Sequence, residues 1–413
     1  MVNILITGAT LFGGACLVYS VVGIAQEMRT DYYRTKRTIR KAIYRARMAM
    51  PKLESRSEKK QLEMPKFISL DKTEYGYLCK YLLPVGVTQY DCFQRIDILE
   101  GALNAEINMW VEGQVWHMEI YNHPVPKHIN YLDVMKHRKE DTVLLGLSRK
   151  GVECLDFKEL VNPHIMIGGM AGVGKSNCMN VIITQLLSMN TELYLIDPKR
   201  VEFNIYENIS KVKSLGKDLG AGVQIANHVV NVLRKREEYL DQLGYQNIHS
   251  FNRSNPESEL PYVFLIVDEF SDFEGVKAFW ENISAIARKG RALGVYLIMA
   301  TQRPSADVLP PSIKANLGVK LAFKVTTLGN SKILIENEKA LLLPNMTGRA
   351  ILDIGIQRQM QVPFLDRKVH SKLLNEYKGD VQNGFNSECN VVSSRASTAP
   401  KRNRKSYGNY GVE

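Results

Sequence analysis

The chain of 413 residues has few of the short motifs that mark disulfide-rich, zinc-binding or serine-hydrolase proteins. Its six cysteines form no CxxC pair, its eight histidines form no HExxH motif, and no GxSxG motif occurs. A disulfide framework and a histidine or cysteine metal centre are therefore not expected. The chemistry of this chain has to come from other residue types.

Positive charge is unevenly distributed along the chain. The net charge is +11, but residues 29–60 alone hold twelve Lys or Arg against three Asp or Glu. The rest is nearly neutral, so any contact with a polyanion would have to use local patches rather than a global field. The apolar fraction of 45% is typical of a protein with a buried core, and the length predicts two globular units with tails.

The first residues form an apolar run long enough to cross a membrane. From Ile4 to Ala25 there is no charged side chain, and about 20 apolar residues span a bilayer as a helix. Basic residues follow this run rather than precede it, which disfavours a cleaved signal peptide. We therefore expect one transmembrane helix within residues 1–28, with the rest on the cytoplasmic side of the cell membrane, where positive flanks stay.

Residues 29–66 are expected to form a basic segment beside the membrane. Ile39, Ile43, Ala46 and Met50 recur at helical spacing within it, so the segment could lie on anionic lipid as an amphipathic helix. The same charges could serve only to orient the membrane helix, or could contact DNA. Clustered charge alone does not distinguish these three hypotheses.

Two folded regions and a tail follow. Residues 67–147 combine an alternating strand pattern at Val115 to Tyr121 with a helical pattern around Tyr90 to Leu103, which predicts a small α+β domain. Residues 148–368 alternate apolar runs with helical stretches, which is typical of a parallel sheet covered on both faces. The apolar runs are HIMIGG, ELYLID, YVFLIVD, GVYLIMA and VKLAFKV. The polar residues 369–413 are expected to be a disordered basic tail.

The second region contains a phosphate-binding loop. The sequence GMAGVGKS fits GxxxxGK[ST] and lies between a strand pattern and a helix pattern, which predicts a RecA-like P-loop NTPase motor of the α/β class. Its glycines permit N–H groups to face phosphate oxygens at the positive end of the following helix. Lys175 is expected to reach the β and γ phosphates of ATP, and Ser176 to ligate Mg²⁺. The predicted loop residues are Gly169, Met170, Ala171, Gly172, Val173, Gly174, Lys175 and Ser176.

Acidic and amide side chains at two further strand ends complete the predicted site. The apolar run from Tyr262 ends in Asp268 and Glu269, and ligands bind at the carboxyl ends of strands in such sheets. Asp268 is expected to bind the Mg²⁺ of ATP together with Ser176, and Glu269 to orient and deprotonate the attacking water. Gln302, which follows the run GVYLIMA, is expected to sense the γ phosphate, with a simple strand-end cap as the alternative.

These residues resemble the FtsK and SpoIIIE family of DNA translocases. The likeness runs through NPHIMIGGMAGVGKSNCMN, LIDPKRVEF, IVDEFSD and RALGVYLIMATQRPSADVLPPSIKANL, and it extends to the smaller domain ahead of them. The resemblance implies a homo-oligomeric ring, a hexamer, with double-stranded DNA in its channel and ATP between subunits. It also implies a catalytic arginine from the neighbouring subunit. Arg291 is the first candidate and Arg288 the second, with an exposed helix end as the alternative.

The resemblance has gaps that narrow the predicted function. No sequence-reading winged-helix module is expected after the motor, and one membrane helix stands where the family carries several, which disfavours chromosome segregation. The predicted function is a membrane-anchored, ATP-driven translocase of double-stranded DNA. It resembles the short transfer ATPases of conjugative plasmids and integrative elements in Gram-positive bacteria, where a relaxase or other transfer proteins would be partners. The alternatives are a protein-secretion ATPase of the same family, a partitioning translocase, and a recruitment platform with a nucleotide switch.

Overall fold

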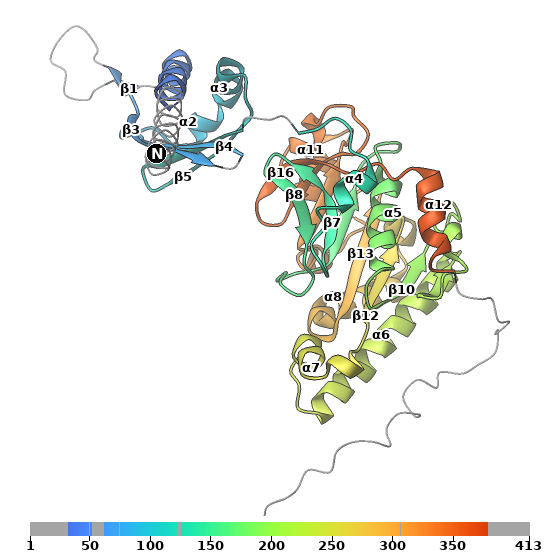
Figure 1. Ribbon diagram of the computed structural model, residues 1–413. Helices are drawn as coiled ribbons and strands as arrows, with labels where there is room; N and C mark the ends of the chain where they lie inside the picture. The colour runs from blue at the N-terminus through green and yellow to red at the C-terminus, as the bar shows by residue number, and fades with distance from the viewer. Residues whose placement is uncertain are drawn as a thin grey trace, which may run out of the picture.

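In the computed structural model the described residues are 32–48, 50–51, 62–73, 75–121, 125–305 and 307–378. They form a small N-terminal lobe and a larger α/β lobe (Figure 1). The predicted membrane helix and most of the predicted tail lie outside the described residues. Within these ranges, no helix is both long and apolar enough to span a bilayer.

The small lobe is a four-stranded antiparallel sheet in the order β3-β4-β6-β5, with helices packed against it. The predicted strand at Val115 to Tyr121 is confirmed as β6. The helical pattern around Tyr90 to Leu103 forms two short helices instead of one, and Thr88 caps the first of them through a capping box. The elements are β1 (Met50–Pro51), β2 (Leu62–Glu63), β3 (Lys66–Thr73), β4 (Gly76–Leu82), α2 (Gln89–Phe93), α3 (Ile96–Leu103), β5 (Ile107–Glu112) and β6 (Val115–Tyr121).

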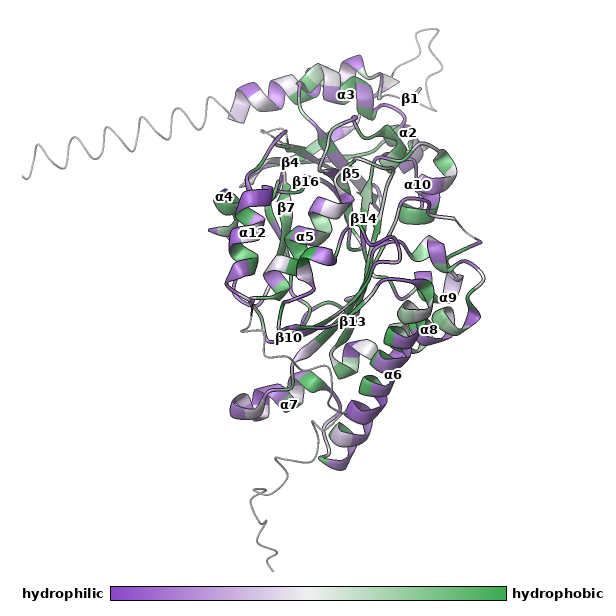
Figure 2. Ribbon diagram, turned by 90° about the vertical axis from the view of Figure 1, so that its right-hand side faces the viewer, coloured by the Kyte–Doolittle hydropathy of each residue, from purple (hydrophilic) through white to green (hydrophobic). Residues whose placement is uncertain are grey.

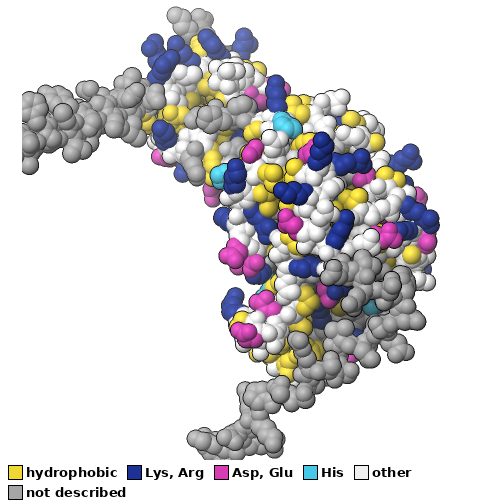
Figure 3. Space-filling model, turned by 45° about the vertical axis from the view of Figure 1, so that its right-hand side comes forward, with side chains coloured by type: hydrophobic (Ala, Val, Ile, Leu, Met, Phe, Trp, Pro, Cys, Tyr) yellow, Lys and Arg dark blue, Asp and Glu magenta, His cyan; other side chains and the backbone are white. Residues whose placement is uncertain are grey.

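A helix over residues 32–45 belongs to this lobe, which corrects the predicted boundary at residue 67. Ile39 and Ile43 are each 1% exposed and Ala46 is 2% exposed, because they pack into the same apolar cluster as the sheet. The apolar face is therefore occupied by protein, which disfavours the hypothesis that it lies on lipid. The arginines of the helix and Lys41 remain exposed, and Lys and Arg crowd the top of Figure 3. Their role in orientation or in DNA contact stays open.

The larger lobe is built on one ten-stranded sheet in the order β11-β10-β12-β13-β9-β14-β15-β16-β7-β8. Its first six strands are parallel, and they include all five predicted apolar runs. Helices cover both faces, so almost every side chain of these runs is buried. The parallel strands are β9 (Ile165–Gly168), β10 (Thr191–Ile196), β11 (Val212–Gly216), β12 (Tyr262–Val267), β13 (Val295–Thr301) and β14 (Val319–Phe323).

Four antiparallel strands, which the apolar pattern of the sequence does not predict, extend this sheet. They are β7 (Val143–Ser148), β8 (Gly151–Leu155), β15 (Arg349–Asp353) and β16 (Gln357–Gln361). Strand β7 pairs with β16 and β8, so the domain boundary predicted at residues 147 and 148 falls inside one strand of the larger lobe. The hairpin strand β16 is mostly polar and only partly buried, which gives no apolar run to recognise.

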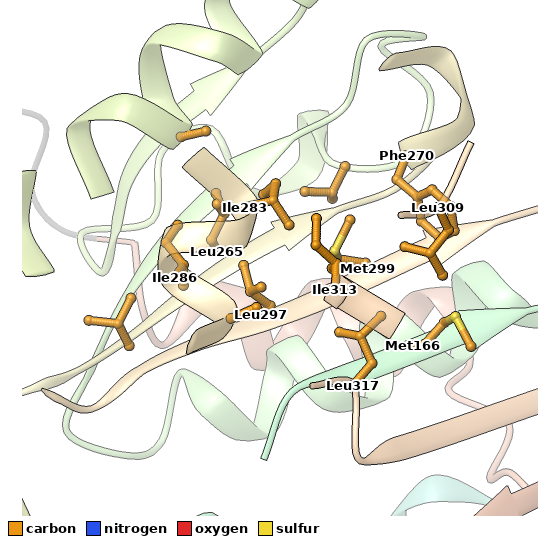
Figure 4. Close-up of a cluster of buried hydrophobic side chains, with 14 of the residues drawn as sticks. Met166, Leu265, Phe270, Ile283, Ile286, Leu297, Met299, Leu309, Ile313 and Leu317 are labelled. Atoms are coloured by element: carbon orange, nitrogen blue, oxygen red, sulfur yellow. The ribbon is translucent and has the colours of Figure 1, made fainter. Parts of the chain in front are cut away.

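Helices enclose the parallel strands from two sides. Helix α5 packs on one face, while α6 and α8 pack on the other (Figure 1). Figure 4 shows the second interface, where Leu265, Leu297 and Met299 of the strands meet Ile283 and Ile286 of α8. The helices of the larger lobe are α4 (Tyr131–Met135), α5 (Lys175–Leu186), α6 (Leu219–Gln242), α7 (Ile248–Ser254), α8 (Lys277–Leu293), α9 (Pro311–Lys314), α10 (Leu328–Ile335), α11 (Lys339–Leu342) and α12 (Arg367–Asn375).

Helix α12 corrects the predicted start of the disordered tail at residue 369. Its Leu374 is 3% exposed and joins the core beneath α5, and the bridge between Ile209 and Lys378 pairs the chain with the larger lobe beyond it. The hydropathy colours of Figure 2 show the same arrangement, with apolar strands inside and helices that turn polar faces outward. The larger lobe therefore extends at least to Lys378.

A buried arginine ties the two long helices together. The guanidinium of Arg236 in α6 donates to the carbonyl oxygens of Leu293 at 3.0 Å, Gly294 at 3.3 Å and Pro261 at 2.5 Å. These carbonyls lie at the end of α8 and ahead of β12, and that of Gly294 also accepts the N–H of Val263 at 2.8 Å. Burial lowers the pKa of Arg236, yet the three acceptors keep its charge satisfied.

We predict that Arg236→Met lowers the free energy of unfolding by about 2 to 4 kcal/mol, because buried carbonyls lose their donor. Urea denaturation followed by circular dichroism measures this change. Arg234→Met is the matched control, because Arg234 lies half a turn earlier in α6 and is exposed. Equal stability of the two variants would show that the buried hydrogen bonds do not hold the helices.

Candidate nucleotide site

The loop between β9 and α5 adopts the conformation that a phosphate-binding loop requires. Gly172 and Gly174 have φ angles of +78° and +105°, which side chains other than glycine rarely adopt. A Cβ atom on Gly174 would also lie 3.0 Å from the backbone nitrogen of Gly348. That same nitrogen donates to the carbonyl of Val173 at 2.8 Å. Gly348, which directly precedes β15, therefore holds the phosphate-binding loop in place.

Lys175 projects back across this loop. Its ammonium donates to the carbonyl oxygens of Gly169 at 2.7 Å and Met170 at 2.8 Å. Burial lowers the pKa of Lys175, and the nearby carboxylates of Glu269 and Asp268 oppose that shift. An ammonium has three donors, so one remains for a phosphate oxygen beside the two carbonyls.

Oxygen atoms suited to Mg²⁺ gather beside the loop. The hydroxyl of Ser176 donates to the carboxylate of Glu202 at 2.6 Å, and Asp268 follows directly after β12. Burial, followed by the carboxylates of Glu202 and Asp197, raises the pKa of Asp268 to about 7. Mg²⁺ prefers hydroxyl, carboxylate and phosphate oxygens, so Ser176 and Asp268 fit an ion shared with ATP. Among the described residues, no group of three His, Cys, Asp or Glu could hold a metal by itself.

Glu269 is a carboxylate enclosed by donors. It is 2% exposed, and its Oε1 accepts from the hydroxyls of both Ser271 and Thr301, each at 2.5 Å. The backbone N–H of Gln302 donates to both oxygens at 3.0 and 3.1 Å, and Lys199 lies 3.7 Å away. These contacts hold the charge of Glu269 in a fixed orientation at the edge of the sheet where a water could approach a phosphate.

The structure brings most of the predicted site residues together. The P-loop, Asp268, Glu269 and the backbone of Gln302 lie at the carboxyl ends of adjacent parallel strands. The side chain of Gln302 is exposed, and its predicted sensing role remains a prediction.

The predicted arginines lie elsewhere. Arg288 and Arg291 lie near the end of α8, which leads into the N-terminal end of β13. The nucleotide site lies at the carboxyl end of this strand, and seven residues of strand separate the two ends by about 23 Å. They line a cleft of about 450 Å³ together with Glu237 and Asp241. This position excludes direct action on the nucleotide site of the same subunit. A role for Arg291 in a neighbouring subunit's site therefore stays a prediction.

Three charged residues near the site were not predicted as site residues. Asp197 and the loop after it, which carries Lys199 and Glu202, follow β10, the strand beside β12. The signal was present, because LID ends a buried parallel run in an acid just as LIVD does. Acids after adjacent parallel strands meet at one edge of the sheet.

Comparison with known proteins agrees with this geometry. Residues 133–306 match the family model described as FtsK/SpoIIIE family. This part of the chain is therefore similar to the FtsK/SpoIIIE family. It is 33% identical over 242 residues to DNA translocase SpoIIIE of Bacillus subtilis, covering 54% of this chain and 31% of that protein. It is 30% identical over 276 residues to DNA translocase FtsK of Bacillus cereus, covering 63% and 33%. The chain thus spans about a third of the length of these FtsK/SpoIIIE relatives.

Solved structures share the fold of this chain. One is the pCW3 conjugation coupling protein TcpA in its monomer form with ATPγS, with a TM-score of 0.57 and 24% identity over 76% of this chain and 94% of that one. Another is the cytoplasmic domain of the type VII secretion ATPase EccC of Thermomonospora curvata. Its TM-score is 0.52 at 20% identity, over 63% of this chain and 34% of that one. At these identities the likeness establishes the fold alone.

We predict that Mg²⁺-dependent binding of ATPγS weakens as pH falls below about 7, by up to about tenfold per pH unit. The pKa of Asp268 is raised to about 7, so the carboxyl becomes neutral below that value and loses its affinity for the cation. Titration of a fluorescent ATPγS analogue across the pH range, with Mg²⁺ or with EDTA, measures the effect. Asp268→Asn should show weak Mg²⁺ dependence at every pH. A wild-type pH profile identical to that of Asp268→Asn would contradict the role of this carboxyl.

Proposed function

We propose that this protein is an ATP hydrolase that moves double-stranded DNA. The observation that carries the proposal is the grouping of the phosphate-binding loop with two carboxylates at one edge of the sheet. Lys175 and Ser176 lie in the phosphate loop, Asp268 lies beside them, and the enclosed Glu269 lies at the same sheet edge. A nucleotide switch that does not hydrolyse ATP has no need of a buried, oriented carboxylate. The relatives that match this part of the chain are named DNA translocases.

The proposed setting is a membrane-anchored ring. Supporting this, the uncharged run from Ile4 to Ala25 is followed by basic residues, which is typical of a membrane helix with its basic flank in the cytoplasm. In a closed ring, a hexamer, Arg291 would act on the nucleotide of a neighbouring subunit, because it lies too far from the nucleotide site of its own subunit. Mg²⁺ would be bound with ATP by Ser176 and Asp268.

We propose that the biological role of this protein is to transfer DNA between cells, as the coupling or pump ATPase of conjugation. The supporting observation is the extent of the likeness to the TcpA structure, which covers 94% of that chain and 76% of this one. Protein secretion is the competing function, favoured by the likeness of the fold to EccC. Partitioning of chromosomes or plasmids is a further alternative, because the sequence relatives are named DNA translocases without a conjugative role.

The test is the ATPase rate with and without linear duplex DNA, at low and moderate salt. We predict a severalfold stimulation by duplex that weakens as salt rises, because phosphate contacts release counterions. Lys175→Ala should abolish hydrolysis in both conditions. Basal hydrolysis without a response to any DNA would overturn the translocase proposal and favour a protein substrate.

The fragment used in this test should begin before residue 32. The helix over residues 32–45 contributes Ile39, Ile43 and Ala46 to the core of the small lobe. A fragment that begins at residue 61 would expose the apolar surface that these side chains cover. If the ATPase rate of such a fragment did not respond to DNA, the result would not distinguish misfolding from a lack of DNA binding.

A further inference from the structure

The loop after β10 brings a second lysine to the phosphate site. Lys199 lies in the sequence DPKRVEF, and β10 pairs in parallel with β12. Its ammonium is 3.4 Å from an oxygen of Asp272 and 3.7 Å from an oxygen of Glu269. The side chain of Lys199 is 47% exposed, whereas that of Glu269 is almost fully buried. Lys199 therefore covers the solvent side of the enclosed carboxylate.

The backbone of this loop is fixed rather than free. One oxygen of Asp197 accepts the N–H of Glu202 at 2.8 Å and that of the following residue at 3.0 Å. Arg200 adopts a left-handed conformation with φ of +60°, which is uncommon for a residue with a side chain. Its Nε donates to the carbonyl of Lys217 at 2.9 Å and holds that turn in place. Lys199 is thus presented on a preformed turn.

The far end of the loop contacts the phosphate-binding loop itself. Glu202 accepts the hydroxyl hydrogen bond of Ser176 at 2.6 Å. Burial is the main cause that lowers the pKa of Lys175; the carboxylate of Glu202 raises this pKa, and the ammonium of Lys199 lowers it. Both side chains are therefore within electrostatic range of the lysine that is expected to hold the β and γ phosphates. One short loop contacts both the phosphate side and the base side of the site.

We propose that Lys199 is a ligand of the terminal phosphate of ATP and that it leaves Glu269 when this phosphate binds. The inference rests on the proposed function, because it requires ATP in the phosphate-binding loop. A γ phosphate carries more charge than a carboxylate and offers three acceptor oxygens to the ammonium. Transfer of the ammonium to the phosphate leaves Oε2 of Glu269 with the N–H of Gln302 as its remaining donor, and this oxygen would then hold the attacking water.

This arrangement makes the loop sensitive to the state of the nucleotide. ADP lacks the terminal phosphate, so Lys199 stays with Glu269 and Asp272 when ADP is bound. ATP draws the side chain of Lys199 away, while the backbone of the loop stays in place, held by Asp197 and Arg200. The same side chain thereby distinguishes ATP from ADP and controls access to the base.

The experiment compares the affinities of the full chain, solubilised in detergent, for ATPγS and for ADP in the presence of Mg²⁺. We expect Lys199→Met to weaken ATPγS binding by about 10- to 100-fold, as for a lost hydrogen bond between charged groups, and ADP binding by less than about threefold. Lys199→Arg should retain most of the preference for ATPγS over ADP. Lys213→Met is the matched control, because Lys213 is 43% exposed and lies 3.9 Å from Glu192 in a similar loose pair, and it should change neither affinity.

The outcomes separate this inference from the proposed function. Retained ADP affinity in Lys199→Met shows that the site is folded, so an unchanged ATPγS to ADP ratio would overturn the role of Lys199. Equal loss of both nucleotides would also overturn it, because a structural role predicts that result. If the wild-type chain binds neither nucleotide, the proposed ATPase fails as well. If Lys175→Ala abolishes binding while Lys199→Met does not alter the ratio, only the Lys199 inference fails.

Discussion

A buried negative charge has to be paired by hydrogen bonds, and in this protein Glu269 imposes that condition on the register of the sheet. Strands β12 and β13 align Val263 with Val295, and the same register carried six residues further places Glu269 beside Thr301. The hydroxyl of Thr301 then reaches the carboxylate at 2.5 Å. A slip of one residue would leave the charge without this donor, at a cost of several kcal/mol. The register and the site thus depend on one another.

The same reasoning extends across the neighbouring strands. Pairing of β13 with β9 places Thr301 beside Gly168, where the phosphate-binding loop begins. Pairing of β10 with β12 aligns Ile196 with Val267 and so sets Asp197 next to Asp268. Burial is the main cause of the raised pKa of Asp268, and the carboxylates of Glu202 and Asp197 add to it. The perturbed acidity of Asp268 is thus a consequence of parallel strands that all end in polar residues at one edge.

The sequence predicted the parallel centre of the sheet because its strands are uniformly apolar and each is followed by a polar strand end. The sequence GMAGVGKS, which lies between a strand pattern and a helix pattern, located the phosphate-binding loop. The acids after YVFLIV located the carboxylates of the site. The antiparallel extension was not predictable in this way, since a strand such as QRQMQ is polar and its partners are distant in sequence. The helix over residues 32–45 was misassigned for a related reason. Its apolar spacing is the same whether the face contacts lipid or protein, and only the fold decides.

The unpredicted strands connect the two lobes with the nucleotide site. Gly348, at the start of β15, donates to the phosphate-binding loop, and the next residue, Arg349, donates to the carbonyls of Val125 and Pro126, which lead into the larger lobe. The turn between β7 and β8 also carries Lys150, which bonds Glu119 of β6 at 2.8 Å. The small lobe is therefore attached to the part of the sheet that braces the nucleotide.

Movement along duplex DNA is the central claim, and displacement of a third strand tests it most directly. A triplex-forming oligonucleotide bound at one end of a linear duplex should be released by the wild-type protein with ATP and Mg²⁺, and should stay bound with ATPγS. Release that requires ATP would establish that hydrolysis at this site drives movement along DNA. Hydrolysis of ATP in the presence of the duplex, with the oligonucleotide still in place, would contradict the account.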